Sequence, residues 1–258
     1  MAKPIQKPNI PNITKATARG LRLKTIAYLL SLKEGRRLAY HLLKRPRSIA
    51  RLVRALLMPK HAHQSGNLFF YNCLSIEDII VELHRPNRIL ILGFSYCEKP
   101  KHCPVGRFNS NCCYDPLNTV CTSCSIGWVR KYNVFKYRIV IIPTFIDIAK
   151  HFFDLEKLYP SHQILFVITA CELSLKMFGD YASIMQLKGM GIRLTGRICN
   201  TFQAFKLAEH GVKPGVPFLE EDGVKALMKI ITLTPRDSKN TINKKKNLLD
   251  NVVLPWDC

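Results

Sequence analysis

The sequence predicts an α/β protein with a mostly parallel sheet of about four strands covered by helices. Segments of strand length, rich in apolar residues, occur at 88–94, 137–143, 163–169 and 191–198. A segment with helical features precedes the first of them, and others follow each strand. Apolar strands that alternate with helices indicate a mostly parallel sheet with helices on both faces.

Capping and breaking residues mark the ends of several predicted helices. Ser75 is expected to begin one, with Asp78 at its third position, where an acidic side chain caps the free backbone N–H groups. Asn200 is expected to begin another, which Gly211 and Pro214 stop. The helices expected after residue 60 are 75–85, 125–131, 144–158, 172–188, 200–210 and 219–231.

The N-terminal quarter of the chain is strongly basic. The formal net charge of the whole chain is +21, and residues 1–60 hold fifteen Lys or Arg but a single acid, Glu34. Helices are expected at 15–33, at 36–44 and from 48 onward. The chain therefore divides into a basic helical extension at 1–60, an α/β cysteine-rich domain at 61–233 and a flexible basic tail at 234–258.

The third of these helices is amphipathic, with arginines on its polar side. Its apolar residues follow helical spacing and are Ile49, Leu52, Val53, Leu56 and Leu57. Such a helix suits an anionic membrane surface, and we expect residues 15–57 to bind there without spanning the bilayer. Two alternatives are that the helix packs on the α/β domain with its charges in water, or that the extension binds nucleic acid. Nucleic acid is the weaker alternative, because residues 1–60 offer only two aromatic side chains, Tyr28 and Tyr40, for base stacking.

The apolar segments are too short for a secretory signal or a membrane span. The first fifteen residues contain three prolines and no apolar core. No apolar run approaches the roughly 20 residues that cross a bilayer. We therefore expect a cytoplasmic protein that attaches peripherally to the inner membrane face. In a reducing compartment, clustered cysteines are more often ligands or catalytic groups than disulfides.

A cysteine-rich loop follows the first predicted strand. Residues 97–124 contain six of the ten cysteines, together with three prolines and little apolar periodicity. A loop of this length in a compact domain is usually functional. Cys121 and Cys124 form a Cys-x-x-Cys pair, the spacing that lets two thiolates reach one metal from a single turn and also the spacing of redox dithiols.

Further cysteines follow the other predicted strands. Cys171 lies just after the third strand and Cys199 directly follows the fourth. Parallel strands end at one edge of a sheet, where ligands bind, so these thiols can meet those of the loop. The alternative is that both are small buried residues. The candidate metal ligands are Cys97, Cys103, Cys112, Cys113, Cys121, Cys124, Cys171 and Cys199.

The irregular spacing of these cysteines favours an iron–sulfur cluster. Zinc knuckles usually show paired Cys-x-x-Cys units with matching halves, but here a single such pair occurs. Zinc is the alternative, since thiolates bind both. The sequence has no GxGxxG, GxxxxGK[ST] or HExxH motif, so it offers no case for a dinucleotide site, an NTPase or a zinc protease. A third hypothesis is an enzyme with Cys171 or Cys124 as nucleophile.

These motifs resemble an uncharacterised cysteine-rich bacterial and archaeal family, catalogued as domain of unknown function number 116. The resemblance covers roughly residues 88–200. Two positions depart from the family pattern: Asn118 replaces a further cysteine, for which Cys112 or Cys113 is a substitute, and Thr144 replaces a glycine. The matching residues are Cys97, Cys103-Pro104, Cys121, Cys124, Ile126, Ile142-Pro143, Ala170-Cys171-Glu172-Leu173 and Gly191-Ile192. The resemblance implies a metal or cluster protein without an established reaction.

The sequence as a whole predicts a metal-binding protein. We expect an iron–sulfur centre, bound by thiolates at the carboxyl edge of the sheet, that serves electron transfer or another redox reaction. The alternative is a zinc-stabilised module that binds nucleic acid or another partner. The sequence identifies no substrate, no protein redox partner and no reaction.

Overall fold

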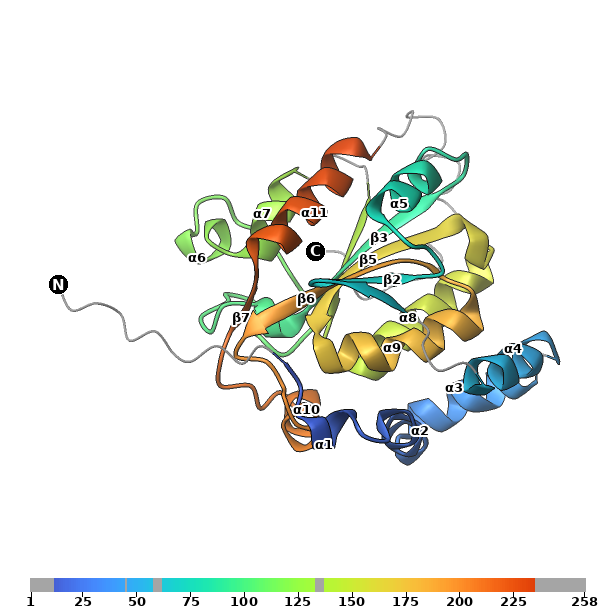
Figure 1. The fold of residues 1–258 in the computed structure, drawn as a ribbon. Helices are drawn as coiled ribbons and strands as arrows, with labels where there is room; N and C mark the ends of the chain where they lie inside the picture. Colours follow the sequence, from blue (N-terminus) through green and yellow to red (C-terminus); the bar gives the residue numbers. More distant parts are fainter. Residues whose placement is uncertain (1–11, 45, 58–61, 133–136, 235–258) are drawn as a thin grey trace.

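The computed structural model describes residues 12–44, 46–57, 62–132 and 137–234, and the predicted basic tail lies almost entirely outside them. Within these residues the chain forms a mixed sheet of seven strands in the order β1-β2-β6-β5-β3-β4, with β7 also paired to β6. Helices cover both faces of this sheet (Figure 1). The strands are β1 His63–Ser65, β2 Leu68–Tyr71, β3 Ile89–Ser95, β4 Arg138–Ile142, β5 Ile164–Cys171, β6 Lys188–Gly196 and β7 Pro217–Leu219.

The predicted α/β class is confirmed, but the prediction of a mostly parallel sheet of about four strands is wrong. The four predicted strands are β3, β4, β5 and β6, and they pair in parallel. Strands β1, β2 and β7 add three antiparallel pairings, β1–β2, β2–β6 and β6–β7. Each of these added strands is only three or four residues long, too short to show a periodic pattern in the sequence.

Strand β6 begins earlier than predicted, within a segment assigned from the sequence to the preceding helix. Gly189 and Gly191 disguise it, because glycine is depleted in strands. Both are required by close packing. A Cβ atom at Gly189 would stand 2.2 Å from the Phe166 carbonyl oxygen, and one at Gly191 would stand 2.5 Å from the Leu175 side chain. A second correction concerns helix α10, whose cap is Thr201, with its hydroxyl accepting from the Ala204 N–H, rather than Asn200.

Each face of the sheet carries its own hydrophobic core. Helices α8 and α9 cover one face around Phe152, Phe166 and Phe178, and α5, α7 and α11 cover the other. The capping boxes at Ser75 and Thr144 start α5 and α8. The helices of the domain are α5 Ile76–Leu83, α6 Thr119–Thr122, α7 Ser125–Tyr132, α8 Phe145–Leu158, α9 Glu172–Met185, α10 Phe202–Glu209 and α11 Glu221–Leu233.

The basic N-terminal helices form a further layer outside α8 and α9 (Figure 1). Leu38 belongs to the same hydrophobic cluster as the buried residues of α8 and α9. Arg22 forms an ion pair with Asp180, in α9, at 2.9 Å. The extension thus packs on the domain. Within the described residues, no helix combines the length and apolarity needed to cross a membrane. The N-terminal helices are α1 Lys15–Ala18, α2 Leu21–Ser31, α3 Lys33–Leu43 and α4 Pro46–Leu57.

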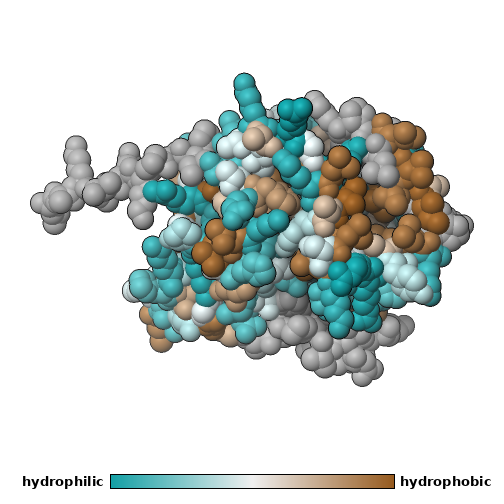
Figure 2. Space-filling model, turned by 90° about the horizontal axis from the view of Figure 1, so that it is seen from below, coloured by the Kyte–Doolittle hydropathy of each residue, from teal (hydrophilic) through white to brown (hydrophobic). Residues whose placement is uncertain are grey.

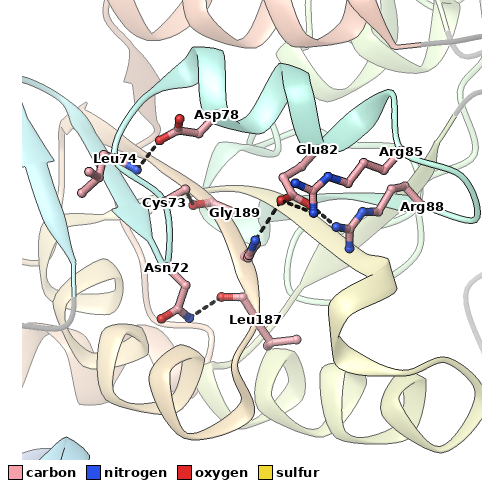
Figure 3. Close-up of polar contacts among 10 residues, drawn as sticks. Asn72, Cys73, Leu74, Asp78, Glu82, Arg85, Arg88, Leu187 and Gly189 are labelled. Atoms are coloured by element: carbon pink, nitrogen blue, oxygen red, sulfur yellow. Dashed lines mark hydrogen bonds and ion pairs between the residues drawn. The ribbon is translucent and has the colours of Figure 1, made fainter.

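A buried carboxylate joins α5 to the amino ends of β3 and β6. Glu82 accepts a hydrogen bond from Lys188 at 2.8 Å, and it forms ion pairs with Arg85, at 3.1 Å, and with Arg88. Figure 3 shows Arg85 and Arg88 converging on Glu82, with Asn72 donating to the Leu187 carbonyl nearby. Glu82 and Arg88 are both nearly inaccessible to solvent, so the charges are stable there only because they pair.

We expect the Glu82→Gln substitution to lower the free energy of unfolding by about 3–5 kcal/mol, because three cations would remain around a neutral group. Chemical denaturation monitored by circular dichroism measures this loss. The matched control is Glu221→Gln, which removes the exposed ion pair with Lys225 and should cost about 1 kcal/mol or less. Equal losses in the two variants would contradict the structural role given to Glu82.

Candidate thiol sites at the carboxyl edge of the sheet

The structure divides the eight predicted thiols between two cavities. One, of about 60 Å³, lies at the carboxyl ends of the parallel strands and is lined by Cys97, Cys171 and Cys199. The other, of about 20 Å³, lies within the long loop after β3. Its lining includes the remaining five candidates, Cys103, Cys112, Cys113, Cys121 and Cys124.

The strand-end cavity holds a pair of interacting thiols. Cys171 ends β5 and is the N-cap residue of α9, and its sulfur lies 3.3 Å from the Ser174 hydroxyl. It also forms a hydrogen bond with Cys199, whose sulfur lies 3.3 Å from the Lys213 ammonium. The bond from Cys199, aided by Ser174 and Lys213, lowers the pKa of Cys171 to about 6, whereas that bond and burial raise the pKa of Cys199. Of the two thiols, Cys171 is therefore the one that loses its proton more readily.

A buried carboxyl group of this cavity, that of Glu209, binds groups from distant segments. Burial raises the pKa of Glu209 to about 7. Its carboxyl group accepts from the Phe145 N–H at the start of α8, at 2.8 Å, and from the Tyr28 hydroxyl, at 2.9 Å. Tyr28 belongs to α2, so the N-terminal extension reaches the edge of the thiol site. Burial also raises the pKa of Cys97, the third thiol of this cavity.

The loop cavity combines four free thiols with buried cations. Cys103, Cys112, Cys121 and Cys124 are free, whereas Cys113 is disulfide-bonded. Lys99 lines the same cavity with only 1% of its surface exposed, and its charge interacts with three of the free thiols. Arg130, in α7, interacts with Cys112, and its buried Nε has no hydrogen-bond partner among the described residues. Thiolates in this loop would thus meet positive charge.

Hydrogen bonds from Lys99 and Arg107 shape the loop. The Lys99 ammonium donates to the Asn109 side chain and to the Asn111 carbonyl, both at 2.8 Å. Arg107 donates to the carbonyls of Lys99, Cys97, Lys213 and Gly215. One guanidinium therefore fastens the loop to the end of β3 and to the segment that carries Lys213, which belongs to the strand-end cavity.

Glu98, whose neighbours in the sequence Cys97 and Lys99 line the two different cavities, is buried as a carboxylic acid. One oxygen accepts from the Ser95 N–H at 3.2 Å and from the Thr169 hydroxyl. The other oxygen has no partner among the residues that the structure describes. Burial raises the pKa of Glu98 to about 8. Near neutral pH the group is therefore largely protonated.

The eight candidate cysteines follow strand ends as expected, but they line two separate cavities. In the described part of the chain, no three His, Cys, Asp or Glu side chains are close enough together to hold a metal ion. Cys73 lies elsewhere, donating to the Gly189 carbonyl at 3.2 Å. The sequence analysis also missed Lys99, Arg107 and Lys213. Nothing in a single sequence distinguishes these cations from solvated ones, because their partners are distant or are backbone carbonyls.

Comparison with known proteins leaves these sites to be interpreted from their own geometry. No family model, curated protein or solved structure matches this chain. The resemblance to domain of unknown function number 116 therefore stays a hypothesis.

Because the buried Glu98 carboxyl group has a raised pKa, we expect the free energy of unfolding to fall as the pH rises. Its pKa in the folded chain, about 8, exceeds the ordinary value of 4.5, so the folded state holds this proton more tightly. The stabilisation is complete below about pH 4.5 and is lost as the pH rises to about 8, at a cost of roughly 3–5 kcal/mol. We expect Glu98→Gln, which stays neutral, to be more stable than the wild type at pH 9 but not at pH 5.

Denaturant unfolding at the two pH values tests this expectation. The control is Glu34→Gln at an exposed position, which should keep the wild-type pH dependence. If the free energy of unfolding changed by the same amount between the two pH values in the wild type and in Glu98→Gln, ionisation of Glu98 would not oppose folding.

Proposed function

We propose that Cys103, Cys112, Cys121 and Cys124 hold an iron–sulfur cluster and that the protein serves electron transfer or another redox reaction. The observation that carries this proposal is that four free thiols of one loop line a common cavity. Four cysteine thiolates are the usual ligands of such clusters. A zinc ion bound by the same thiolates is the alternative.

The charges around the loop cavity support an anionic centre. Thiolates are costly to bury unless positive charge or hydrogen bonds compensate them. Lys99 and Arg130 supply that charge, and the free Nε–H of Arg130 is a donor without an assigned acceptor. Hydrogen bonds to cluster sulfurs and nearby charge set the reduction potential of such centres. Both side chains would therefore act on the cluster as well as stabilise it.

Binding a cluster requires the thiols to move closer together, because no three metal-ligating side chains share a site in the described residues. The loop has the means to do so. Apart from a short 3₁₀ helix at Tyr96–Glu98 and helix α6, it lacks regular structure between the end of β3 and α7, and Lys99 and Arg107 hold it through hydrogen bonds. The strand-end thiols are excluded from this proposed ligand set, because they line a separate cavity.

Anaerobic purification of the full chain should yield a coloured protein that contains iron and acid-labile sulfide. Single substitutions Cys121→Ser and Cys124→Ser should remove most of the iron, because each deletes a ligand. Cys73→Ser, which changes a free cysteine outside both cavities, should keep it. A colourless, iron-free protein with one zinc would replace the cluster by the zinc alternative, and equal iron loss from Cys73→Ser would refute the assigned ligands.

The basic extension favours a second role, attachment to an anionic membrane. Helix α4 packs against the domain, yet Ile49, Val53 and Leu57 remain 42%, 51% and 80% exposed. Figure 2 looks onto the side of the N-terminal helices and shows hydrophobic side chains gathered at the right of this face, where Figure 1 places α3 and α4. Exposed basic residues surround them, namely Lys33, Arg36, Arg37, Lys44 and Arg54. Apolar side chains flanked by cations suit anionic lipid headgroups.

We expect the full chain to sediment with vesicles that contain phosphatidylserine, less so with neutral vesicles, and to be released by salt. The combined substitutions Ile49→Gln, Val53→Gln and Leu57→Gln should weaken binding about tenfold or more, because they remove apolar area that enters the lipid. The matched control replaces Leu74, Leu117 and Val212, also exposed but outside the extension, with Gln. Equal effects of the two triple variants would count against this surface.

A further inference from the structure

We propose that Cys171 and Cys199 form a redox-active dithiol that reduces low-molecular-weight disulfides by thiol–disulfide exchange. This inference goes beyond the proposed metal centre and does not depend on it. It concerns the strand-end cavity, whose thiols have no part in the proposed cluster.

The two sulfurs are already neighbours, although their residues lie far apart in the sequence. The parallel pairing of β5 with β6 brings Cys171 opposite Leu194, and the chain beyond β6 returns Cys199 to the same cavity. Both residues line the strand-end cavity, and each thiol acts on the pKa of the other. A disulfide between them would therefore need only a local approach of the two sulfurs, without rearrangement of the sheet.

The two cysteines differ in exposure in the way that exchange requires. Cys171 is partly accessible, whereas Cys199 has only 3% of its surface exposed. A thiol that attacks an external disulfide has to be reachable, and the thiol that then displaces the product is protected inside the protein. The geometry thus makes Cys171 the attacking group and Cys199 the resolving group.

The surroundings of each sulfur suit these roles. Cys171 sits at the N-terminus of the fourteen-residue helix α9, where the helix dipole and the Ser174 hydroxyl, 3.3 Å from the sulfur, stabilise a thiolate. The Lys213 ammonium stands 3.3 Å from the Cys199 sulfur and stabilises the thiolate that forms there in the second step. The low pKa of Cys171 agrees with this geometry.

The reaction balances without any further group. The Cys171 thiolate attacks one sulfur of a disulfide RS–SR′, forms a Cys171–SR mixed disulfide and releases R′S⁻. Cys199 then passes its proton to the released thiolate and attacks the Cys171 sulfur. The Cys171–Cys199 disulfide forms and RS⁻ leaves. RS⁻ takes a proton from water, which balances the proton that the Cys171 thiol gave up to water when it formed its thiolate. Two protein thiols are oxidised and one disulfide is reduced to two thiols, and an external dithiol reverses the change in the protein.

The size of the cavity favours a small substrate. Its volume of about 60 Å³ accepts little more than the sulfur end of a ligand, so the rest of the substrate must remain outside. The Lys213 ammonium favours a leaving group that departs as an anion. Oxidised glutathione presents such a disulfide and serves as the probe.

The test follows glutathione release from oxidised glutathione by the reduced full chain, and then maps the cysteines by acid quenching, alkylation and mass spectrometry. The wild type should yield a linked Cys171–Cys199 peptide. Cys199→Ser should stop at a mixed disulfide between Cys171 and glutathione, and Cys171→Ser should release no more than a buffer blank. Cys73→Ser should behave as the wild type. Ser174→Ala should slow the first step by about tenfold, since it removes one hydrogen bond to the thiolate.

Three results would overturn the proposal. One is oxidation that links loop cysteines while Cys171 and Cys199 stay reduced. Another is wild-type glutathione release by Cys171→Ser. The third is loss of bound metal from Cys171→Ser or Cys199→Ser in protein purified anaerobically, which would make these thiols ligands. Loss of iron from Cys121→Ser together with normal exchange would support both proposals, and the absence of metal with normal exchange would remove the cluster alone. Circular dichroism shows whether each variant is folded. Ser174→Ala keeps both thiols, so a slower first step in this variant does not come from a missing thiol.

Discussion

Both thiol sites depend on the parallel alignment of β3, β5 and β6. In this register Ile89 pairs with Ile164, and Leu165 pairs with Lys188, so the three strands run side by side and end at the same edge. The chain segments that leave that edge carry Cys97, Cys171 and Cys199. Burial of both sheet faces fixes this register, because a shift of one residue would turn each strand's apolar side chains to the opposite face. The chemistry of the edge therefore rests on packing far from any cysteine.

Buried polar groups then decide how the edge is divided. Arg107 bonds to four backbone carbonyls, two next to the end of β3 and two in the segment after α10. It thereby holds the cysteine loop against the segment that supplies Lys213 to the strand-end cavity. Lys99 and Glu98, adjacent in sequence, act differently: Lys99 faces the loop thiols, whereas Glu98 bonds to Ser95 and Thr169. Two cavities of distinct character arise on either side of one short segment.

The N-terminal extension connects with this edge rather than standing apart from it. Its helix α2 supplies Tyr28, whose hydroxyl meets Glu209 at the rim of the strand-end cavity, while α4 leaves apolar side chains on the outer surface. The N-terminal helices would thus connect a membrane bound at α4 with the thiol site at the strand ends. In the proposed attachment, exposed cations on the same layer would favour anionic lipid headgroups.

The sequence alone determined the α/β class, the four parallel strands, the capped start of α5, and the placement of thiols after the strands, because apolar runs and capping residues are local signals. The short antiparallel strands and the early start of β6 were decided only by tertiary contacts, such as those that leave no room for a Cβ at Gly189 and Gly191. The split of the cysteines into two sites was decided in the same way. The contacts of Lys99, Arg107 and Lys213 are made with backbone carbonyls and sulfurs that the fold brings together. Such contacts produce no periodic pattern in the sequence.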